Sequence, residues 1–186
     1  MPELLPWQVL QTETVYDQPP WLRVERQAVR LTNGEVIPDY LLTPSRDYSM
    51  IVARTDTSEI LLVRQYKHGL GRIVLDFPAG YLDSPDEDPL ACAQRELREE
   101  TGYAARHWTA LGHYAMDSNR ATSGAYLFAA HGLTRVAEPQ LDATEALQHL
   151  TRPAREIPAL LATGEMPTLA CAAAWGLAAG VLFDSP

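Results

Sequence analysis

The sequence has few cysteines, and it has no long apolar run. Among its 186 residues only Cys92 and Cys171 are cysteines; both lie among alanines, without the spacing of metal ligands. A disulfide framework is therefore excluded, and both side chains are expected to be buried, reduced thiols. No apolar stretch reaches the roughly 18 residues of a membrane-spanning helix, and the N-terminal segment lacks a signal peptide's basic and apolar regions. We expect a soluble, cytoplasmic protein without a membrane partner.

Basic residues are also scarce. The chain carries 15 Lys and Arg against 24 Asp and Glu, a net charge of −9, and has no basic stripe interleaved with aromatic residues. Binding to DNA or RNA depends on neutralising phosphates, so a nucleic-acid partner is not expected. A small phosphate-bearing substrate remains compatible, because a metal and a few arginines offset its charge locally. The length and the 46% hydrophobic content suit one catalytic domain with a core and a short appendage.

What the sequence does contain is a crowded acidic pattern. Glu96, Glu99 and Glu100 follow Arg95 at i, i+3 and i+4, which places the three carboxylates on one face of a helix. Like charges at this spacing repel each other and destabilise a helix. A fold that keeps them together is expected to neutralise them with a divalent cation, Mg²⁺ or Mn²⁺.

The residues around this pattern predict a helix over Pro89–Thr101. Asp88 is a favourable N-cap, Pro89 suits the first helical position, and Gly102 suits the left-handed position that ends a helix. Before the helix, the apolar residues 73–75 predict a strand, and residues 77–80 predict a tight loop whose glycine allows the backbone to approach a cation or phosphate.

Elsewhere the pattern predicts short strands mixed with a few helices, an α+β or α/β sandwich arrangement. Residues 152 onward are expected to be helical. The expected strands are 21–31, 36–42, 50–54, 60–65, 107–114 and 125–130, with a turn at Asn33-Gly34, a polar loop over 116–124, and helices over 155–162 and 168–182.

Taken together, the central segment resembles the signature of the Nudix hydrolases, G-x5-E-x7-R-E-U-x-E-E-x-G-U, in which U is a bulky apolar residue. The matching positions are Gly80, Glu87, Arg95, Glu96, Leu97, Glu99, Glu100, Gly102 and Tyr103. One position departs: six residues rather than five separate Gly80 from Glu87. Either the loop holds one extra residue, or Asp86 takes the place of the first glutamate.

Three further segments resemble the ADP-ribose and nucleoside-diphosphate-sugar pyrophosphatase branch of that family. They are residues 61–67, residues 77–80, and Gly164 to Ala170. The resemblance implies an α+β fold, an α/β/α sandwich with a mixed sheet, preceded by a small N-terminal antiparallel sheet that is often used for dimerisation. It implies a division into an appendage, residues 1–45, and a catalytic domain, residues 46–186, and it implies a homodimer, although a monomer with an extra hairpin remains an alternative.

The same resemblance implies roles for individual residues. Glu96 and Glu100 would bind the metal with the Ala79 carbonyl, Glu99 would hold the metal or a water, Arg95 would orient the glutamates, and Glu87 would anchor the loop. The substrate would contact Arg64, Tyr66, Lys67 and Gly80, while Gly102 would be structural. The 116–124 loop departs from the branch because it lacks the sequence S-P-G; Arg120 would either supply a replacement cation for the substrate or cap a surface turn.

Several alternatives stay open on sequence alone. Glu145 falls where the branch carries a glutamate that acts as catalytic base or metal ligand, with Asp142 and Glu99 as the other candidates. Lys67 stands where the branch has an arginine, and a lysine cannot make the two-pronged contact of a guanidinium with phosphate. Trp21, Tyr40 and Tyr66 are candidates either for stacking on a base or for packing.

The implied reaction is metal-dependent hydrolysis of the pyrophosphate bond in a nucleoside diphosphate linked to a sugar, with ADP-ribose as the first candidate. The alternatives are GDP-mannose, a dNTP, coenzyme A or a dinucleoside polyphosphate as substrate, or a sensor that binds ADP-ribose without turnover.

Overall fold

The structure, a computed structural model, describes residues 4–141 and 146–183. The chain divides into two compact units. One contains the residues up to Arg46 together with Ala115–Gly124, and the other contains Asp47–Tyr114 together with the residues from Ala125 onward. The 115–124 loop is tied to the first unit by hydrogen bonds, from Thr43 N–H to the Arg120 carbonyl at 2.8 Å and from the Tyr40 hydroxyl to the Asn119 carbonyl at 2.7 Å.

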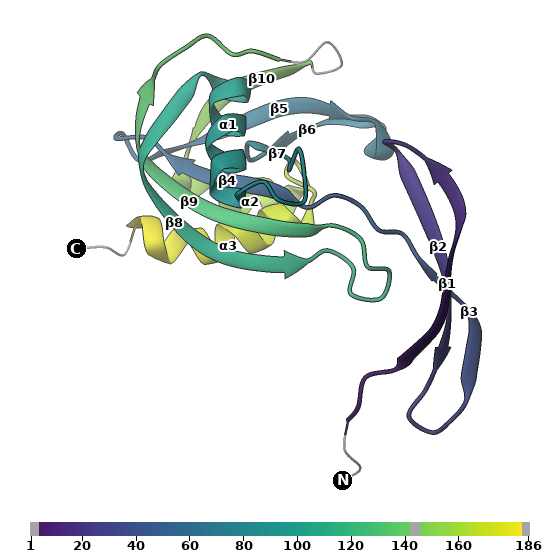
Figure 1. The fold of residues 1–186 in the computed structure, drawn as a ribbon. Helices are drawn as coiled ribbons and strands as arrows, with labels where there is room; N and C mark the ends of the chain where they lie inside the picture. The colour runs from purple at the N-terminus through teal and green to yellow at the C-terminus, as the bar shows by residue number, and fades with distance from the viewer. Residues whose placement is uncertain (1–3, 142–145, 184–186) are drawn as a thin grey trace. The chain divides into compact units, whose positions relative to one another are not determined.

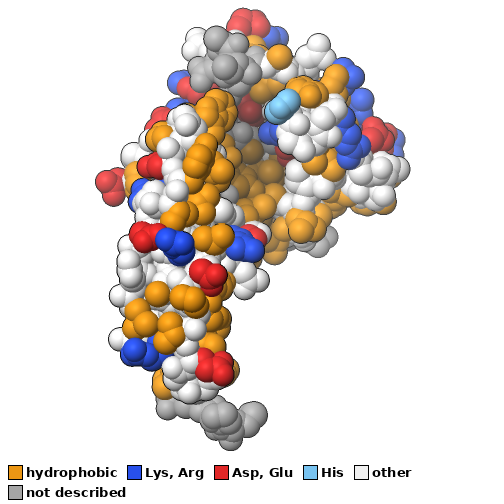
Figure 2. All heavy atoms as spheres, turned by 90° about the vertical axis from the view of Figure 1, so that its right-hand side faces the viewer, with side chains coloured by type: hydrophobic (Ala, Val, Ile, Leu, Met, Phe, Trp, Pro, Cys, Tyr) orange, Lys and Arg blue, Asp and Glu red, His pale blue; other side chains and the backbone are white. Residues whose placement is uncertain are grey.

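The first unit contains an antiparallel sheet of β1 (Gln8–Gln18), β2 (Leu22–Arg30) and β3 (Val36–Leu42), in that order. The predicted turn at Asn33-Gly34 joins β2 to β3, where the Asn33 side chain accepts a hydrogen bond from Glu35 N–H. Almost every residue of β1 is exposed. Figure 2 shows hydrophobic side chains on the surface of this sheet, so the sheet displays apolar area that its own unit does not cover.

The second unit is built on a mixed sheet with the order β10-β5-β4-β9-β8, in which β6 also pairs with β5 and β7 with β4. β4 runs parallel to β9 and antiparallel to β5 and β7. The strands are β4 (Tyr48–Arg54), β5 (Glu59–Lys67), β6 (Arg72–Asp76), β7 (Ala79–Tyr81), β8 (Tyr103–Ala115), β9 (Gly124–Arg135) and β10 (Leu147–Pro153).

Helices cover both faces of this sheet (Figure 1). On one face α1 (Pro89–Thr101) buries Ala93 and Leu97 against Ile51 and Ala53 of β4. On the other face, the cluster that contains Met50 and Val52 packs against α2 (Ile157–Thr163) and α3 (Leu169–Phe183). Alternate residues of β4 thus point into two cores, which explains its continuous apolar run. The predicted α/β/α sandwich, with a mixed sheet and an N-terminal antiparallel sheet, is confirmed.

Three strands, β1, β7 and β10, were not among the strands predicted by residue range. The expectation that the chain turns helical at Arg152 is wrong, because Arg152 and Pro153 end β10, which pairs with β5 from Leu147↔Gln65 to Pro153↔Glu59. A 3-10 turn, η2 (Ala154–Glu156), precedes α2, and another, η1 (His68–Leu70), follows β5. The three-residue β7 arises from pairing with β4 inside the predicted loop. In the described parts of the chain, no helix is long and apolar enough to cross a membrane.

Candidate active site

The ends of α1 are fixed by its sequence. The Asp88 carboxylate accepts a hydrogen bond from Leu90 N–H at 3.3 Å, Pro89 occupies the first turn, and Gly102 ends the helix at φ 77°. These bounds confirm the predicted helix. With Ala93 and Leu97 directed into the core, the neighbouring Glu96 and Glu100 are directed toward residues 77–80, the predicted loop, whose last two residues begin β7.

Glu96 and Glu100 are buried carboxylates that meet that loop. Their exposed fractions are 9% and 4%. Glu100 Oε2 accepts a hydrogen bond from Ala79 N–H at 3.1 Å. Glu96 packs directly on Gly80, where an added Cβ would lie 2.0 Å from the Glu96 carboxyl carbon. Only glycine allows this contact, so helix and loop are matched to each other at these two carboxylates.

Arg95 joins the acidic residues of the helix to those of the preceding loop. Its Nη1 lies 2.6 Å from Glu96 Oε1 and 3.3 Å from Glu99 Oε2, and its Nη2 lies 3.3 Å from Glu87 Oε1. Burial alone would lower the pKa of Arg95, but the hydrogen bond to Glu87 and the charge and hydrogen bond of Glu96 raise it. The guanidinium therefore stays charged and offsets part of the repulsion among the carboxylates.

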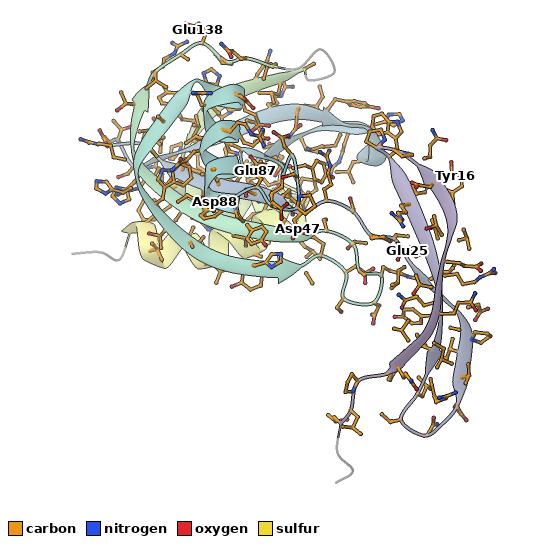
Figure 3. All side chains as sticks on the ribbon, viewed as in Figure 1. Tyr16, Glu25, Asp47, Glu87, Asp88 and Glu138 are labelled. Atoms are coloured by element: carbon orange, nitrogen blue, oxygen red, sulfur yellow. The ribbon has the colours of Figure 1, made fainter. Side chains whose placement is uncertain are left out.

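Glu87 fastens the loop before α1, where it lies beside the start of the helix near Asp88 (Figure 3). Its Oε2 accepts a hydrogen bond from Asp83 N–H at 2.6 Å, and its Oε1 pairs with Arg95. The hydrogen bond from Asp83 lowers the pKa of Glu87, while burial opposes this and Arg95 adds to it. Glu87 thus makes these contacts despite the extra residue after Gly80, so the loop accommodates the insertion.

The donor chemistry of this region fits a divalent cation of the Mg²⁺ type. Such cations bind oxygen ligands, and Glu96 and Glu100 bring buried carboxylate oxygens to one loop. Glu99 adds a more exposed carboxylate that shares Arg95 with Glu96. Within residues 4–141 and 146–183, no three His, Cys, Asp or Glu side chains are already arranged to hold a metal. The fit lies in the ligand type and in the space that Gly80 provides.

The predicted substrate residues are distributed over both units. Arg64 is exposed on β5, and Lys67 ends the same strand. The hydroxyl oxygen of Tyr66 lies 3.4 Å from His68 Nδ1. Arg120 belongs to the first unit, where it donates to the Leu41 carbonyl at 3.2 Å. Their contact with substrate stays a prediction.

The acidic segment before β10 is described only in part. Glu138 is exposed at the edge of the molecule, where its carboxylate pairs with Arg135 at 2.6 Å (Figure 3). Glu145 and Asp142, the candidates for the catalytic base, lie outside the described residues. Among the candidates for base stacking, Trp21 is 83% exposed and Tyr66 53% exposed, whereas Tyr40 packs edge-on against Trp7.

Sequence reasoning missed one charged residue beside the loop. Asp76 ends β6, is 5% exposed, and has its carboxylate 3.9 Å from Lys67 Nζ. Its signal in the sequence was an acid inside the apolar run Ile73–Phe77, because a buried carboxylate persists only with partners.

The sequence model of the NUDIX domain matches residues 44–162, and that of the nucleoside diphosphate sugar hydrolase N-terminal domain matches residues 7–40. The chain is 32% identical over 123 residues to the ADP-ribose pyrophosphatase of Mycobacterium tuberculosis, covering 66% of this chain and 59% of that protein. It is 33% identical over 99 residues to the ADP-ribose pyrophosphatase of Bacillus subtilis, covering 53% of each. These matches thus span little more than half the length of either relative.

A crystal structure described as an ADP compounds hydrolase has the same fold. It superimposes with a TM-score of 0.87 at 27% identity, over 98% of this chain and 97% of that chain. The likeness therefore includes the three-stranded N-terminal sheet as well as the sandwich. With the helix, the glycine loop and the family model in agreement over most of the sequence, the chain belongs to the Nudix family.

Proposed function

We propose that the protein is a metal-dependent hydrolase that cleaves the pyrophosphate bond of a nucleoside diphosphate linked to a sugar, with ADP-ribose as the preferred substrate. The observation that carries this proposal is the pair of buried carboxylates, Glu96 and Glu100, held against the Ala79-Gly80 backbone in a Nudix-family chain. The relatives named ADP-ribose pyrophosphatase and the match to the nucleoside diphosphate sugar hydrolase N-terminal domain support the substrate class.

In this reaction the oxygen of a water molecule bonds to one phosphorus, and the bond from that phosphorus to the bridging oxygen breaks. ADP-ribose gives AMP and ribose 5-phosphate. The obstacle is the negative charge that gathers on the phosphate oxygens. Mg²⁺ or Mn²⁺, when bound, supplies positive charge at the pyrophosphate and makes a water molecule more acidic.

The chain's own residues divide the remaining work. Glu96 and Glu100 would hold the cation with the Ala79 carbonyl, and Gly80 keeps the loop close enough to do so. Arg95 keeps Glu96 and Glu99 in place through its ion pairs. The proton of the attacking water goes to a carboxylate, for which Glu145, Asp142 and Glu99 are the candidates.

The positive residues at the end of β5 would hold the substrate. Arg64 and Lys67 supply positive charge for its phosphates. Lys67 acts as a point charge rather than as a fork, which predicts weaker and less directional binding than an arginine gives.

We also propose that two copies associate through the first unit. The sheet β1–β3 exposes large hydrophobic side chains, including Val9, Leu10, Val15, Tyr16, Leu22 and Val36. Apolar area of this kind marks interaction surfaces. Sedimentation equilibrium is expected to give twice the chain mass of 20.6 kDa, whereas a monomer at micromolar concentration would contradict this part.

A substrate screen tests the activity. ADP-ribose, GDP-mannose, UDP-glucose, NADH, coenzyme A and dNTPs are incubated with Mg²⁺ or Mn²⁺, and phosphate is measured after phosphatase treatment. We expect ADP-ribose to have the highest kcat/KM and the Glu100→Gln variant to be at least about 100-fold slower. A higher kcat/KM for coenzyme A or a dNTP would contradict the substrate assignment, and tight ADP-ribose binding without turnover would favour a sensor.

A further inference from the structure

Asp76 is a buried carboxylate three residues before Ala79, whose N–H binds Glu100 of the candidate active site. It ends β6 and directly precedes residues 77–80, the loop that meets Glu96 and Glu100. A carboxylate in an apolar interior is costly unless hydrogen-bond donors surround it. Burial accordingly raises the pKa of Asp76, while the hydrogen bond from Cys171, the charge of Lys67 and the hydrogen bond from Phe77 N–H oppose that increase.

The two oxygens of Asp76 have different partners. Oδ1 accepts hydrogen bonds from Phe77 N–H at 3.0 Å and from Cys171 Sγ of α3 at 2.8 Å. Oδ2 lies 3.9 Å from Lys67 Nζ. Burial and the charge of Asp76 raise the pKa of the Cys171 thiol, so the sulfur keeps its proton and acts as the donor. One oxygen is thus fixed inward, and the other is presented to the lysine.

Lys67 needs a fixed carboxylate beside it if its ammonium group is to keep one position. A lysine side chain has a flexible four-carbon stem and binds phosphate as a point charge without fixed direction. Its side chain is 43% exposed, while that of Asp76 is 7% exposed. A mobile ammonium group next to a fixed carboxylate is confined to a small region, and that carboxylate directly precedes residues 77–80 in the chain.

We propose that Asp76 is a positioning residue that holds the Lys67 ammonium in place for a phosphate of the substrate, with the Cys171 thiol fixing the orientation of the carboxylate. This inference rests on the proposed function. It assigns Asp76 a role in substrate affinity, in contrast to a purely structural role in which it only joins α3 to the end of β6.

A kinetic cycle separates the two roles. Asp76→Asn, Lys67→Met and the double variant are compared with wild type, and Asp56→Asn, in the exposed turn after β4, serves as the matched control. We expect each single variant to raise KM for ADP-ribose about tenfold with kcat within about threefold of wild type. The double variant is expected to be no worse than the poorer single variant, because both remove the same interaction. Multiplying effects in the double variant, or a loss confined to kcat, would overturn the proposal.

A second measurement does not require turnover. The titration of the Asp76 side-chain carboxyl is followed by ¹³C NMR in wild type, Lys67→Met, Cys171→Ser and Cys171→Ala. We expect a higher pKa in Lys67→Met and Cys171→Ala, and a nearly unchanged value in Cys171→Ser, which keeps a donor. An unchanged pKa in Lys67→Met would overturn the proposal even where Asp76→Asn fails to fold. If wild type hydrolyses none of the substrates while these shifts are present, the proposed function fails and the Asp76–Lys67 coupling stands.

Discussion

The contact between Gly80 and Glu96 gives the sharpest prediction, because it depends on a single missing methyl group. Gly80→Ala would place a Cβ 2.0 Å from the Glu96 carboxyl carbon and 2.1 Å from its Oε1. Non-bonded carbon atoms normally lie about 3.5–4.0 Å apart. The Glu96 carboxylate must therefore move by about 1.5 Å or more.

The size of this displacement determines how far kcat is expected to fall. Catalytic groups misplaced by about 1 Å reduce rates on the order of 100-fold. We therefore expect kcat of Gly80→Ala to fall by about two orders of magnitude, with weaker Mn²⁺ binding. The atoms that must move are the end of a flexible side chain, so the free energy of unfolding should fall by no more than about 2 kcal/mol.

Two further variants control this prediction. Gly176→Ala adds a Cβ in α3 that meets no atom within 4 Å apart from its chain neighbours and the backbone of its own helix, and it should leave kcat unchanged. Adding Glu96→Asp to Gly80→Ala withdraws the carboxylate by one C–C bond, about 1.5 Å, and should restore part of the activity. ADP-ribose hydrolysis and Mn²⁺ titration by electron paramagnetic resonance are the assays. Wild-type kcat and Mn²⁺ affinity in Gly80→Ala would refute the reasoning.

Three other predictions follow from the same contacts. Arg95→Ala should lower the free energy of unfolding by about 2 kcal/mol without added metal, because it removes the ion pair between Arg95 and the buried Glu96. Mg²⁺ should recover part of that loss, and urea titrations with and without Mg²⁺ measure both changes. Gly102→Ala should destabilise the protein by about 2 kcal/mol or more in the same assay, because its φ is 77° and the added Cβ would lie 2.3 Å from the rigid Ala137 carbonyl oxygen. Burial raises the pKa of Asp76 in the folded state, so the unfolded chain releases this proton at a lower pH than the folded protein does. The stability that protonated Asp76 contributes is therefore lost as pH rises from about 4 through the raised pKa. Asp76→Asn should remove that fall, and identical pH–stability curves for the variant and wild type would contradict the assignment.

The parts of the fold that could be predicted from sequence are those with local causes. Asp88, Pro89 and Gly102 define α1 through capping, and the apolar runs define β4 and β5. The strand β10 could not be predicted in this way, because Leu147–Pro153 is largely polar and ends in proline; its conformation comes from pairing with β5.

The candidate site also has features that a local sequence pattern predicts and features that depend on long-range contacts. The spacing of the glutamates follows from the helical period, but their burial against Ala79 and Gly80 depends on a loop that precedes the helix by several residues. The contact of Asp76 with Cys171 joins residues 95 positions apart, which no local pattern reveals. Long-range contacts of this kind are set by how the sheet and helices pack.

The most direct test of the account is to locate the metal. Crystals of the wild-type protein soaked in a Mn²⁺ salt are examined by anomalous scattering at the manganese edge. We predict a peak about 2.0–2.3 Å from carboxylate oxygens of Glu96 and Glu100, and no such peak in Glu100→Gln crystals soaked in the same way. Manganese bound only elsewhere on the protein, or no peak in the wild type at millimolar Mn²⁺, would contradict the assignment of these two glutamates as the metal ligands.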